Sequence, residues 1–258
     1  MLRQVNMNSV RAIDRAIELL EVFTIERPAL TIDEITAATK LPKTTAYRIL
    51  YTLERHGLIH YDPKTLKYRL GLKILELSAT LTSVLDVRRE AEEILIDLQM
   101  KAKQTVVMAV PEHDSLVYIF KRENPEGIKY SSVLGQRRPL HFGVLGQIML
   151  AYLSEEELDR YLQTHALDRY TANTVTDAAL LKKKLEQIRS EKVNVDMEET
   201  FEFGNAIGAP VFNADGKLIA AVGVIGPSAD LNREKIAELK PVIRDVGIEI
   251  SRRMGYLR

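Results

Sequence analysis

The sequence predicts an α+β protein with two domains. Apolar residues recur mostly at helical spacing in the first hundred residues, and β-rich runs such as residues 105–110 and 116–120 then alternate with helical patterns. Charge is divided as well: residues 1–73 hold 12 Lys or Arg and 8 Asp or Glu, a net +4, and the remainder carries a net −4. A basic front and an acidic back indicate two domains with different partners.

The composition is that of a globular protein and excludes several chemistries. Of the 258 residues, 46% are hydrophobic, and the mean hydropathy is −0.11. No apolar run approaches the roughly 18 residues of a membrane span, and residues 1–9 lack the apolar core of a signal peptide. We therefore expect a soluble, cytoplasmic protein without a membrane partner. The absence of cysteine excludes disulfides, thiolate metal sites and a cysteine nucleophile.

Two helices are predicted at the front of the chain. Ser9 is a suitable N-cap for the first, and Pro28 cannot continue a helix. Thr31 and Glu34 have the spacing of a capping box, which opens a second helix that runs to about Thr39. The first helix presents one apolar face, made of Val10, Ile13, Ile17 and Leu20.

A third helix is predicted over residues 43–56, with Pro42 at its start and Gly57 after its end. Its outward side offers groups that suit DNA: Thr can contact a base edge or a thymine methyl, Arg can fork onto guanine, and Lys and Tyr can hold phosphates. The outward residues are Lys43, Thr44, Thr45, Tyr47 and Arg48, and the packing stripe is Ala46, Ile49, Leu50 and Leu53.

A basic hairpin is predicted next, with strands at residues 58–61 and 66–70 and a turn at 62–65. Lys64, Lys67 and Arg69 are available there for backbone phosphates. Helix, capped helix, short turn, helix and basic hairpin together indicate a winged helix-turn-helix that binds DNA through residues 1–71. The alternative is a small helical domain with a solvated hairpin.

Residues 72–86 are predicted to form a linker helix. Three of its leucines, Leu77, Leu81 and Leu85, recur every four residues. This stripe either pairs with a partner subunit or packs on its own wing domain. The helix is predicted from Leu72, Leu75, Leu77, Ala79, Leu81 and Leu85.

The remaining residues, 87–258, are predicted to form an α+β domain. Ser154 and Glu157 form another capping box, and the dipeptide at 215–216 is a turn signal between two strands. Helices are expected at residues 87–103, 144–153, from 155, 177–191 and 233–254, and strands at 105–110, 116–120, 129–134, 192–195, 207–213 and 218–225.

Taken with these elements, several motifs resemble the IclR family of bacterial transcriptional regulators over nearly the whole chain. The front motifs are shared with other winged-helix families, and the rear motifs are more specific. The motifs are SVRAIDRA (9–16), LPKTTAYRIL (41–50), LERHGL (53–58), GQIMLAYL (146–153), DMEE (196–199) and IGAPVF (207–212), through to the Gly-Pro pair at 226–227.

The resemblance implies a winged helix-turn-helix, a linker helix, and an effector-binding domain related to GAF and profilin-like folds. It implies a homodimer or dimer of dimers on a palindromic double-stranded operator, controlled by a small metabolite, usually an organic acid or aromatic compound. Repression is the first expectation, and activation is also known in the family. The expected DNA contacts are Arg11, Thr31, Lys43, Thr44, Thr45, Tyr47, Arg48, Lys64 and Lys67.

The resemblance places the effector near the loop before the buried helix and beside the last strands. Relatives that bind small carboxylates often have Ser-x-Ser-Gly where this chain has Gly223, Val224, Ile225 and Gly226, and a Lys where it has Gln147. These departures predict a larger or more apolar effector than a small keto acid. The expected contacts are Leu134, Val144, Leu145, Asp196, Pro210, Gly223 and Ile225.

Three further features have two interpretations each. Arg137 and Arg138 either supply a cation for an acidic ligand or belong to a solvated loop, and His141 is interpreted as a structural loop residue rather than as a ligand or a base. Asp196 lies close in sequence to Glu198 and Glu199, and such carboxylates are more often a charged loop than an acid–base pair. The histidines are scattered and hydrolase, metalloprotease and phosphate-loop motifs are absent from the sequence.

We therefore predict a protein that is not an enzyme and that needs neither cofactor nor metal. A nucleoid protein without a sensor is the remaining alternative. A nucleoid protein of this kind would have no function for the acidic second half of the chain.

Overall fold

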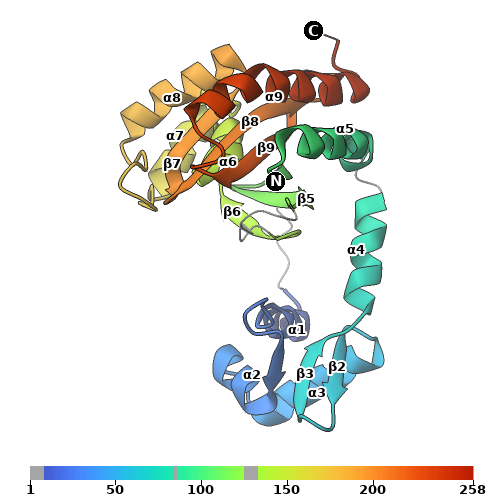
Figure 1. The fold of residues 1–258 in the computed structure, drawn as a ribbon. Helices are drawn as coiled ribbons and strands as arrows, with labels where there is room; N and C mark the ends of the chain where they lie inside the picture. Colours follow the sequence, from blue (N-terminus) through green and yellow to red (C-terminus); the bar gives the residue numbers. More distant parts are fainter. Residues whose placement is uncertain (1–8, 84–85, 125–132, 258) are drawn as a thin grey trace. The chain divides into compact units, whose positions relative to one another are not determined.

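The computed structural model describes residues 9–83, 86–124 and 133–257, and the chain divides into two compact units between residues 84 and 85 (Figure 1). The first unit holds a three-stranded antiparallel sheet in the order β1-β3-β2. Its elements are α1 (Arg11–Glu21), β1 (Ala29–Thr31), α2 (Ile32–Thr39), α3 (Lys43–Arg55), β2 (Ile59–Asp62), β3 (Lys67–Leu70) and α4 (Lys73–Ser83).

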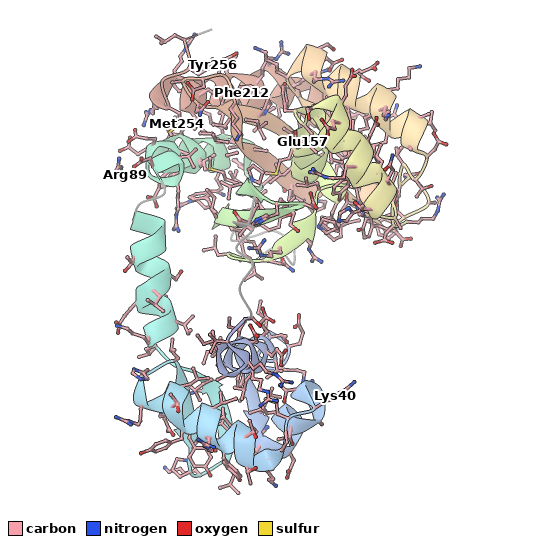
Figure 2. The ribbon with its side chains drawn as sticks, turned by 180° about the vertical axis from the view of Figure 1, so that it is seen from behind. Lys40, Arg89, Glu157, Phe212, Met254 and Tyr256 are labelled. Carbon is pink, nitrogen blue, oxygen red and sulfur yellow. The ribbon has the colours of Figure 1, made fainter. Side chains whose placement is uncertain are left out.

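The helix-turn-helix forms as its caps predict. Thr31 accepts a hydrogen bond from the Glu34 amide at 3.3 Å, and Glu34 Oε2 accepts one from the Thr31 amide at 2.8 Å. Lys40, marked in Figure 2, ends α2 in the left-handed region with φ 56°. Gly57 has φ +71° just after α3, a conformation that glycine adopts without strain. Ala46, Leu50 and Leu53 of α3 are buried, and Ile49 is half-buried.

Helix α1 differs from the prediction at its start. Its N-cap is Val10, which makes no side-chain cap, and the Ser9 hydroxyl instead donates to Asp14 Oδ2 at 2.6 Å. Most of the predicted apolar face is exposed, with Ile13 58% and Ile17 49% accessible, whereas Leu20 is half-buried against the core of this unit. The residue that α1 buries is Leu19, because it faces α2 and α3.

The leucines at the start of the linker segment are not buried on the wing domain. Leu72, just before α4, and Leu75 and Leu77 within it are 80%, 67% and 53% exposed. Leu77 is the described member of the predicted stripe, and for this residue the interpretation that the stripe packs on its own wing is wrong. The side chains of residues 79 and 81–85 lie outside the described part of the chain.

The second unit is built on a six-stranded antiparallel sheet in the order β6-β5-β4-β9-β8-β7. The prediction of a strand at residues 129–134 is wrong at its end, since Val133 and Leu134 lie in a turn closed by the Gln136 amide and the Val133 carbonyl (3.0 Å). Residues 129–132 lie outside the described residues. The strands are β4 (Thr105–Glu112), β5 (Ser115–Arg122), β6 (Arg137–Pro139), β7 (Asn194–Phe201), β8 (Gly204–Phe212) and β9 (Leu218–Pro227).

Helices cover both faces of this sheet and enclose two cores (Figure 1). One face packs on α5 and α9, and the other on α6, α7 and α8. Along the central strands, alternate residues point to opposite cores: Ile207 joins the first and Ala206 the second. The helices are α5 (Asp86–Ala102), α6 (Gly143–Ala151), α7 (Glu155–Thr164), α8 (Ala178–Glu191) and α9 (Arg233–Arg253).

Candidate nucleic-acid interface and effector pocket

One face of α3 is exposed and polar, and it carries the groups that the sequence predicts for DNA. Thr44 and Arg48 are exposed, and Tyr47 is 46% exposed. Because residues four apart stack along a helix, Tyr51 extends this face by one turn beyond Tyr47, and it is 64% exposed. Tyr51 was not predicted from the sequence, since it lies past the N-terminal turns that usually contact bases.

Most of the other predicted DNA contacts on the helices are already paired or partly buried. Lys43 pairs with Asp33 at 2.6 Å, and this hydrogen bond raises the pKa of the Lys43 ammonium. The Thr31 hydroxyl is occupied by its capping box, and Thr45 is half-buried. Arg11 begins α1 and is exposed.

The wing presents its cations on the outer side of a short hairpin. Asp62 accepts hydrogen bonds from the Lys64 amide (2.9 Å) and the Thr65 hydroxyl (2.8 Å), which hold the turn and lower the pKa of Asp62. Lys64 and Lys67 are exposed, as is Arg69. A rigid hairpin with exposed cations is suited to contact the phosphate backbone.

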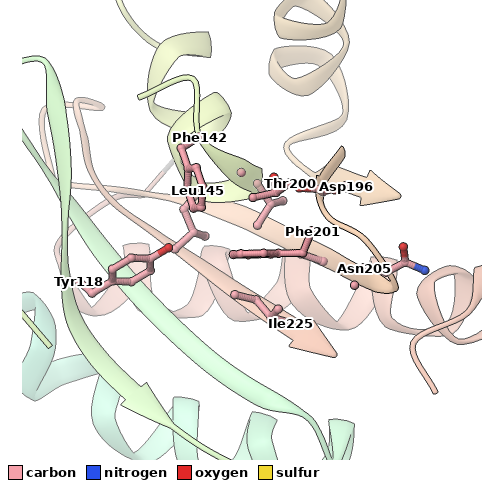
Figure 3. A pocket seen from close by; sticks show the side chains of 12 residues that line it. Tyr118, Phe142, Leu145, Asp196, Thr200, Phe201, Asn205 and Ile225 are labelled. Atoms are coloured by element: carbon pink, nitrogen blue, oxygen red, sulfur yellow. Dashed lines mark hydrogen bonds between the residues drawn. The ribbon is translucent and has the colours of Figure 1, made fainter. Parts of the chain in front are cut away.

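A pocket opens in the second unit between the N-terminus of α6 and the sheet (Figure 3). The space between its lining side chains is about 360 Å³, open solvent at the mouth included. The labelled side chains of Tyr118, Phe142, Phe201 and Ile225 surround it, whereas the Asn205 amide points away. The lining residues are Tyr118, Phe142, Gly143, Val144, Leu145, Asp196, Thr200, Phe201, Gly204, Asn205, Ala206 and Ile225.

Asp196 is the buried carboxylate of this pocket, with 2% of its surface exposed. Its Oδ1 accepts from the Glu199 amide at 2.7 Å, and its Oδ2 accepts from the Thr200 hydroxyl. Burial raises the pKa of Asp196 despite these hydrogen bonds. Asp196 is therefore a strong acceptor for a ligand that donates a hydrogen bond.

The backbone around Asp196 bulges out of strand register, and a network holds it. Glu198 has φ 58°, and the Thr171 and Thr174 hydroxyls donate to the Glu198 and Glu199 carbonyls, each at 2.7 Å. Lys184 pairs with the half-buried Glu199 carboxylate at 2.6 Å. These contacts fix the bulge that carries the polar side of the pocket.

The N-terminus of α6 is tied to the same strand. Asn194 donates from Nδ2 to the Val144 carbonyl at 3.1 Å and to Gln147 Oε1 at 3.0 Å. Gln147 in turn approaches Glu199 at 3.5 Å. No side chain caps α6, since its N-cap residue is Phe142. The first amides of α6 therefore face the pocket region without a side-chain acceptor.

Aromatic rings form the opposite wall. Phe142 contacts Tyr170 and Phe201 edge to face, with centroids 5.0 and 5.7 Å apart. The Arg138 guanidinium lies 4.8 Å from the centroid of the Phe142 ring. Burial raises the pKa of Tyr118 to about 12, so its hydroxyl remains protonated at neutral pH. The wall is apolar, with a cation at its edge.

His141 is buried beside this wall, and its contacts agree with a structural role. Its Nδ1 lies 2.9 Å from the Tyr161 hydroxyl and its Nε2 3.2 Å from the Tyr170 hydroxyl. Burial lowers the pKa of His141, although Asp168 opposes this effect. The neutral ring can satisfy both hydroxyls, so His141 supports Tyr170 and through it Phe142.

The structure brings together four of the seven predicted effector contacts: Val144, Leu145, Asp196 and Ile225. Gly223 lies directly beneath α6, where a Cβ would stand 2.9 Å from Leu145 Cδ2. Leu134 is 50% exposed in a turn, and Pro210 lines a different cavity. The other residues that line the pocket were not predicted from the sequence: Tyr118, Phe142, Gly143, Thr200, Phe201, Gly204, Asn205 and Ala206.

Within residues 9–83, 86–124 and 133–257, no three His, Asp or Glu side chains are grouped so that they can hold a metal ion. In the same part of the chain, no helix has the length and apolar character needed to cross a bilayer.

A winged helix-turn-helix joined to an α+β domain with an internal pocket defines a DNA-binding regulator that responds to a ligand. Comparison with known families agrees. Residues 12–63 match the IclR helix-turn-helix domain, and residues 79–252 match the bacterial transcriptional regulator IclR C-terminal domain. The chain belongs to the IclR family of transcriptional regulators, and it is not an enzyme.

Individual relatives extend over nearly the whole chain. The HTH-type transcriptional regulator XynR of Escherichia coli is 28% identical over 250 residues, covering 97% of this chain and 99% of its own. The HTH-type transcriptional repressor AllR of Escherichia coli is 27% identical, covering 97% and 93%. The crystal structure of an IclR homolog from Microbacterium hydrocarbonoxydans, complexed with 4-hydroxybenzoate, shares the fold with a TM-score of 0.84 at 22% identity, covering 94% and 98%.

Proposed function

We propose that this chain is a repressor whose affinity for a palindromic operator changes when a small organic molecule fills the pocket beneath α6. The carrying observation is the pairing of an exposed polar recognition face on α3 with an enclosed pocket lined by a buried carboxylate and aromatic rings. The relative AllR is named a repressor, which supports this sign of regulation. Activation by the same architecture is the alternative. Binding to the chromosome places the protein in the cytoplasm.

The DNA contacts of this proposal lie on α3 and the wing. Arg48 and Thr44 read bases, Tyr47 and Lys43 hold phosphates, and the wing cations contact the neighbouring backbone. Their exposure supports the assignment, and among the described residues Arg48 forms no ion pair within 4.0 Å. Arg11, Thr31, Thr45, Lys64 and Lys67 complete the proposed contact set.

The proposed effector is a compact molecule with an apolar body and a hydrogen-bond donor. The pocket's rings suit a flat apolar body, and Asp196 suits a donor. Gly223 and Ile225 stand where relatives that bind small carboxylates have serines, which disfavours a small keto acid. The complex of the Microbacterium homolog with 4-hydroxybenzoate supports an aromatic ligand for this fold.

The proposed assembly is a homodimer or dimer of dimers. Exposed apolar side chains on α1 and α4, such as Ile13 and Leu75, support a subunit contact in the first unit. Two recognition helices then occupy successive major grooves, with half-sites one helical turn or more apart. The effector shifts this arrangement only if it binds the two arrangements with different affinity.

The test begins with selection of a binding sequence from random double-stranded DNA. We expect a palindromic site, and we expect Arg48→Ala to abolish selection. A panel containing 4-hydroxybenzoate, neutral phenols and small keto acids is then added to the complex in a gel-shift assay. Release by an aromatic compound supports the proposal, tight binding of a keto acid overturns the effector assignment, and failure to select any DNA overturns the function.

A further inference from the structure

A second cavity lies at the end of β8, beside the residue that ends α8 and the second half of α9. It holds about 240 Å³, its mouth included. Phe212 and Tyr256, labelled close together in Figure 2, belong to it. The lining residues are Lys192, Pro210, Phe212, Arg244, Ile248, Ser251 and Tyr256, and none of them lines the pocket beneath α6.

Arg244 is the unusual group of this cavity. Its Nε is buried and has no hydrogen-bond partner. Within the described part of the chain, neither Arg244 nor the neighbouring Lys192 forms an ion pair within 4.0 Å. A buried N–H without a partner costs free energy, and a charged one costs more. A native arginine left in this state is suited to an anion that arrives from solution.

The surrounding charges leave the cavity positive. Glu191 is the acid in the field of Arg244, but it already pairs with Lys240 at 2.7 Å and accepts from Gln187 at 2.9 Å. Lys192 follows α8 in the left-handed region, where a cation complements the helix C-terminus. The C-terminus of α8 therefore accounts for the positive charge of Lys192. No comparable contact accounts for the charge of Arg244 among the described residues.

The rest of the cavity is apolar or already satisfied. The Phe212 and Tyr256 rings lie 5.2 Å apart, beside Ile248 and Pro210. The Ser251 hydroxyl donates to the Gly247 carbonyl at 2.6 Å and accepts from the Phe212 amide at 2.9 Å, so it offers little to a ligand. Recognition would therefore combine two cations with flat apolar walls.

We infer that this cavity is a second ligand site, for a small carboxylate carried on a flat apolar body. The guanidinium of Arg244 would fork onto the carboxylate, the Lys192 ammonium would add charge, and the body would lie against Tyr256 and Phe212. The inference does not depend on the effector assigned to the pocket beneath α6, because the two sites share no lining residue.

The test uses benzoate as the probe, and benzamide as a probe of the same shape without charge. The full chain is titrated at constant ionic strength, and the ring signals of Tyr256 are followed by NMR after assignment with Tyr256→Phe. We expect benzoate, and not benzamide, to shift the Tyr256 signals in a saturable manner. We expect Arg244→Met and Lys192→Met each to weaken binding at least tenfold, while Arg252→Met, an exposed arginine of the same helix, leaves it unchanged.

Thermal unfolding without ligand separates a binding role from a structural one. Arg244→Met removes an unpartnered buried donor, so the melting temperature should stay the same or rise. A marked fall would identify Arg244 as a structural group and would overturn the inference. Equal shifts by benzoate and benzamide, a benzoate response that survives Arg244→Met, or no response of Tyr256 would overturn it as well.

Discussion

Asp196 shows how one buried side chain couples the pocket to pH. Its pKa is raised above the ordinary value of 3.8, chiefly by burial. The unfolded chain therefore ionises first as pH rises, and the folded state binds the extra proton. This group is neutral in both states below about pH 3.8, and it destabilises the fold increasingly as pH rises from there through the folded pKa.

The first prediction follows from this loss of stability with rising pH. Asp196→Asn should remove this contribution, so the variant should gain stability relative to the wild type as pH rises above 4, and the two should converge at lower pH. Thermal unfolding of both proteins from pH 3 to 8 measures the difference. A stability difference independent of pH would show that Asp196 does not titrate differently in the folded state. Ligands that donate to a carboxylate should bind the variant more weakly.

Arg48 supplies the second prediction, at the recognition face of α3. If its guanidinium forks onto guanine, Arg48→Ala should weaken operator binding by about 1–3 kcal/mol and relax the preference at one base position. Fluorescence anisotropy against the selected operator and its single-base variants measures both effects. A loss of equal size on every sequence would instead identify Arg48 as a phosphate contact. Lys67→Ala is the comparison, since a phosphate contact lowers the salt slope by about 1.

At the scale of elements, the position of α6 depends on close packing rather than on side-chain capping. A Cβ on Gly146 would stand 2.4 Å from the Leu140 carbonyl oxygen. Because that oxygen belongs to the backbone, it cannot move away unless the chain itself shifts. Asn194 holds the other side of the helix at the Val144 carbonyl. The helix that forms the roof of the pocket thus has little freedom to move.

Gly146→Ala is therefore expected to shift α6, to cost about 1–3 kcal/mol as overpacked cores do, and to weaken effector binding. Urea denaturation and ligand titration measure the two effects. Ser154→Ala is the control: it removes the α7 cap, at about 0.5–2 kcal/mol, and Ser154 does not line the pocket. Equal binding by both variants would show that α6 is not the positioning element.

The helices and strands also show which parts of the fold can be predicted from the sequence. Caps such as Thr31 and Ser154 are local, and both formed as predicted because the hydrogen bonds join residues three apart. Strand β1 was missed because its three residues gain their structure from pairing with β3, thirty-eight residues away at Leu30 and Tyr68. A pattern within a few neighbouring residues cannot indicate a partner strand that lies so far away in the sequence.

The pocket was predictable only in part for a related reason. Val144 and Asp196 came from the family resemblance, and the structure places both at the pocket. Thr200 and Phe201 reach it through a bulge at Glu198, whose positive φ occurs without a glycine to signal it. The threonine contacts that hold this bulge come from a loop about 25 residues away in sequence, so tertiary structure determines which side chains meet.

At the scale of the whole molecule, the exposed leucines of α4 are the clearest sign of an assembly. A lone subunit would present Leu72, Leu75 and Leu77 to water, and large exposed apolar side chains gathered in one segment are typical of an interaction surface. The palindromic operator proposed above would also require two recognition helices in one particle. Pairing of subunits through α4 would supply both conditions.

The last prediction tests that pairing. Leu75→Glu combined with Leu77→Glu should leave the fold intact, because both side chains are more than half exposed, and should convert the dimer to monomers by placing like charges at the contact. Operator affinity should then fall by about 10²–10⁴, since linked half-site binding is lost. Sedimentation velocity and anisotropy measure the two changes, and Met100→Glu, at an exposed apolar residue of α5, controls for the added charge. A dimer that survives the double substitution would place the subunit contact on another surface, and the exposed face of α1 would be the next to test.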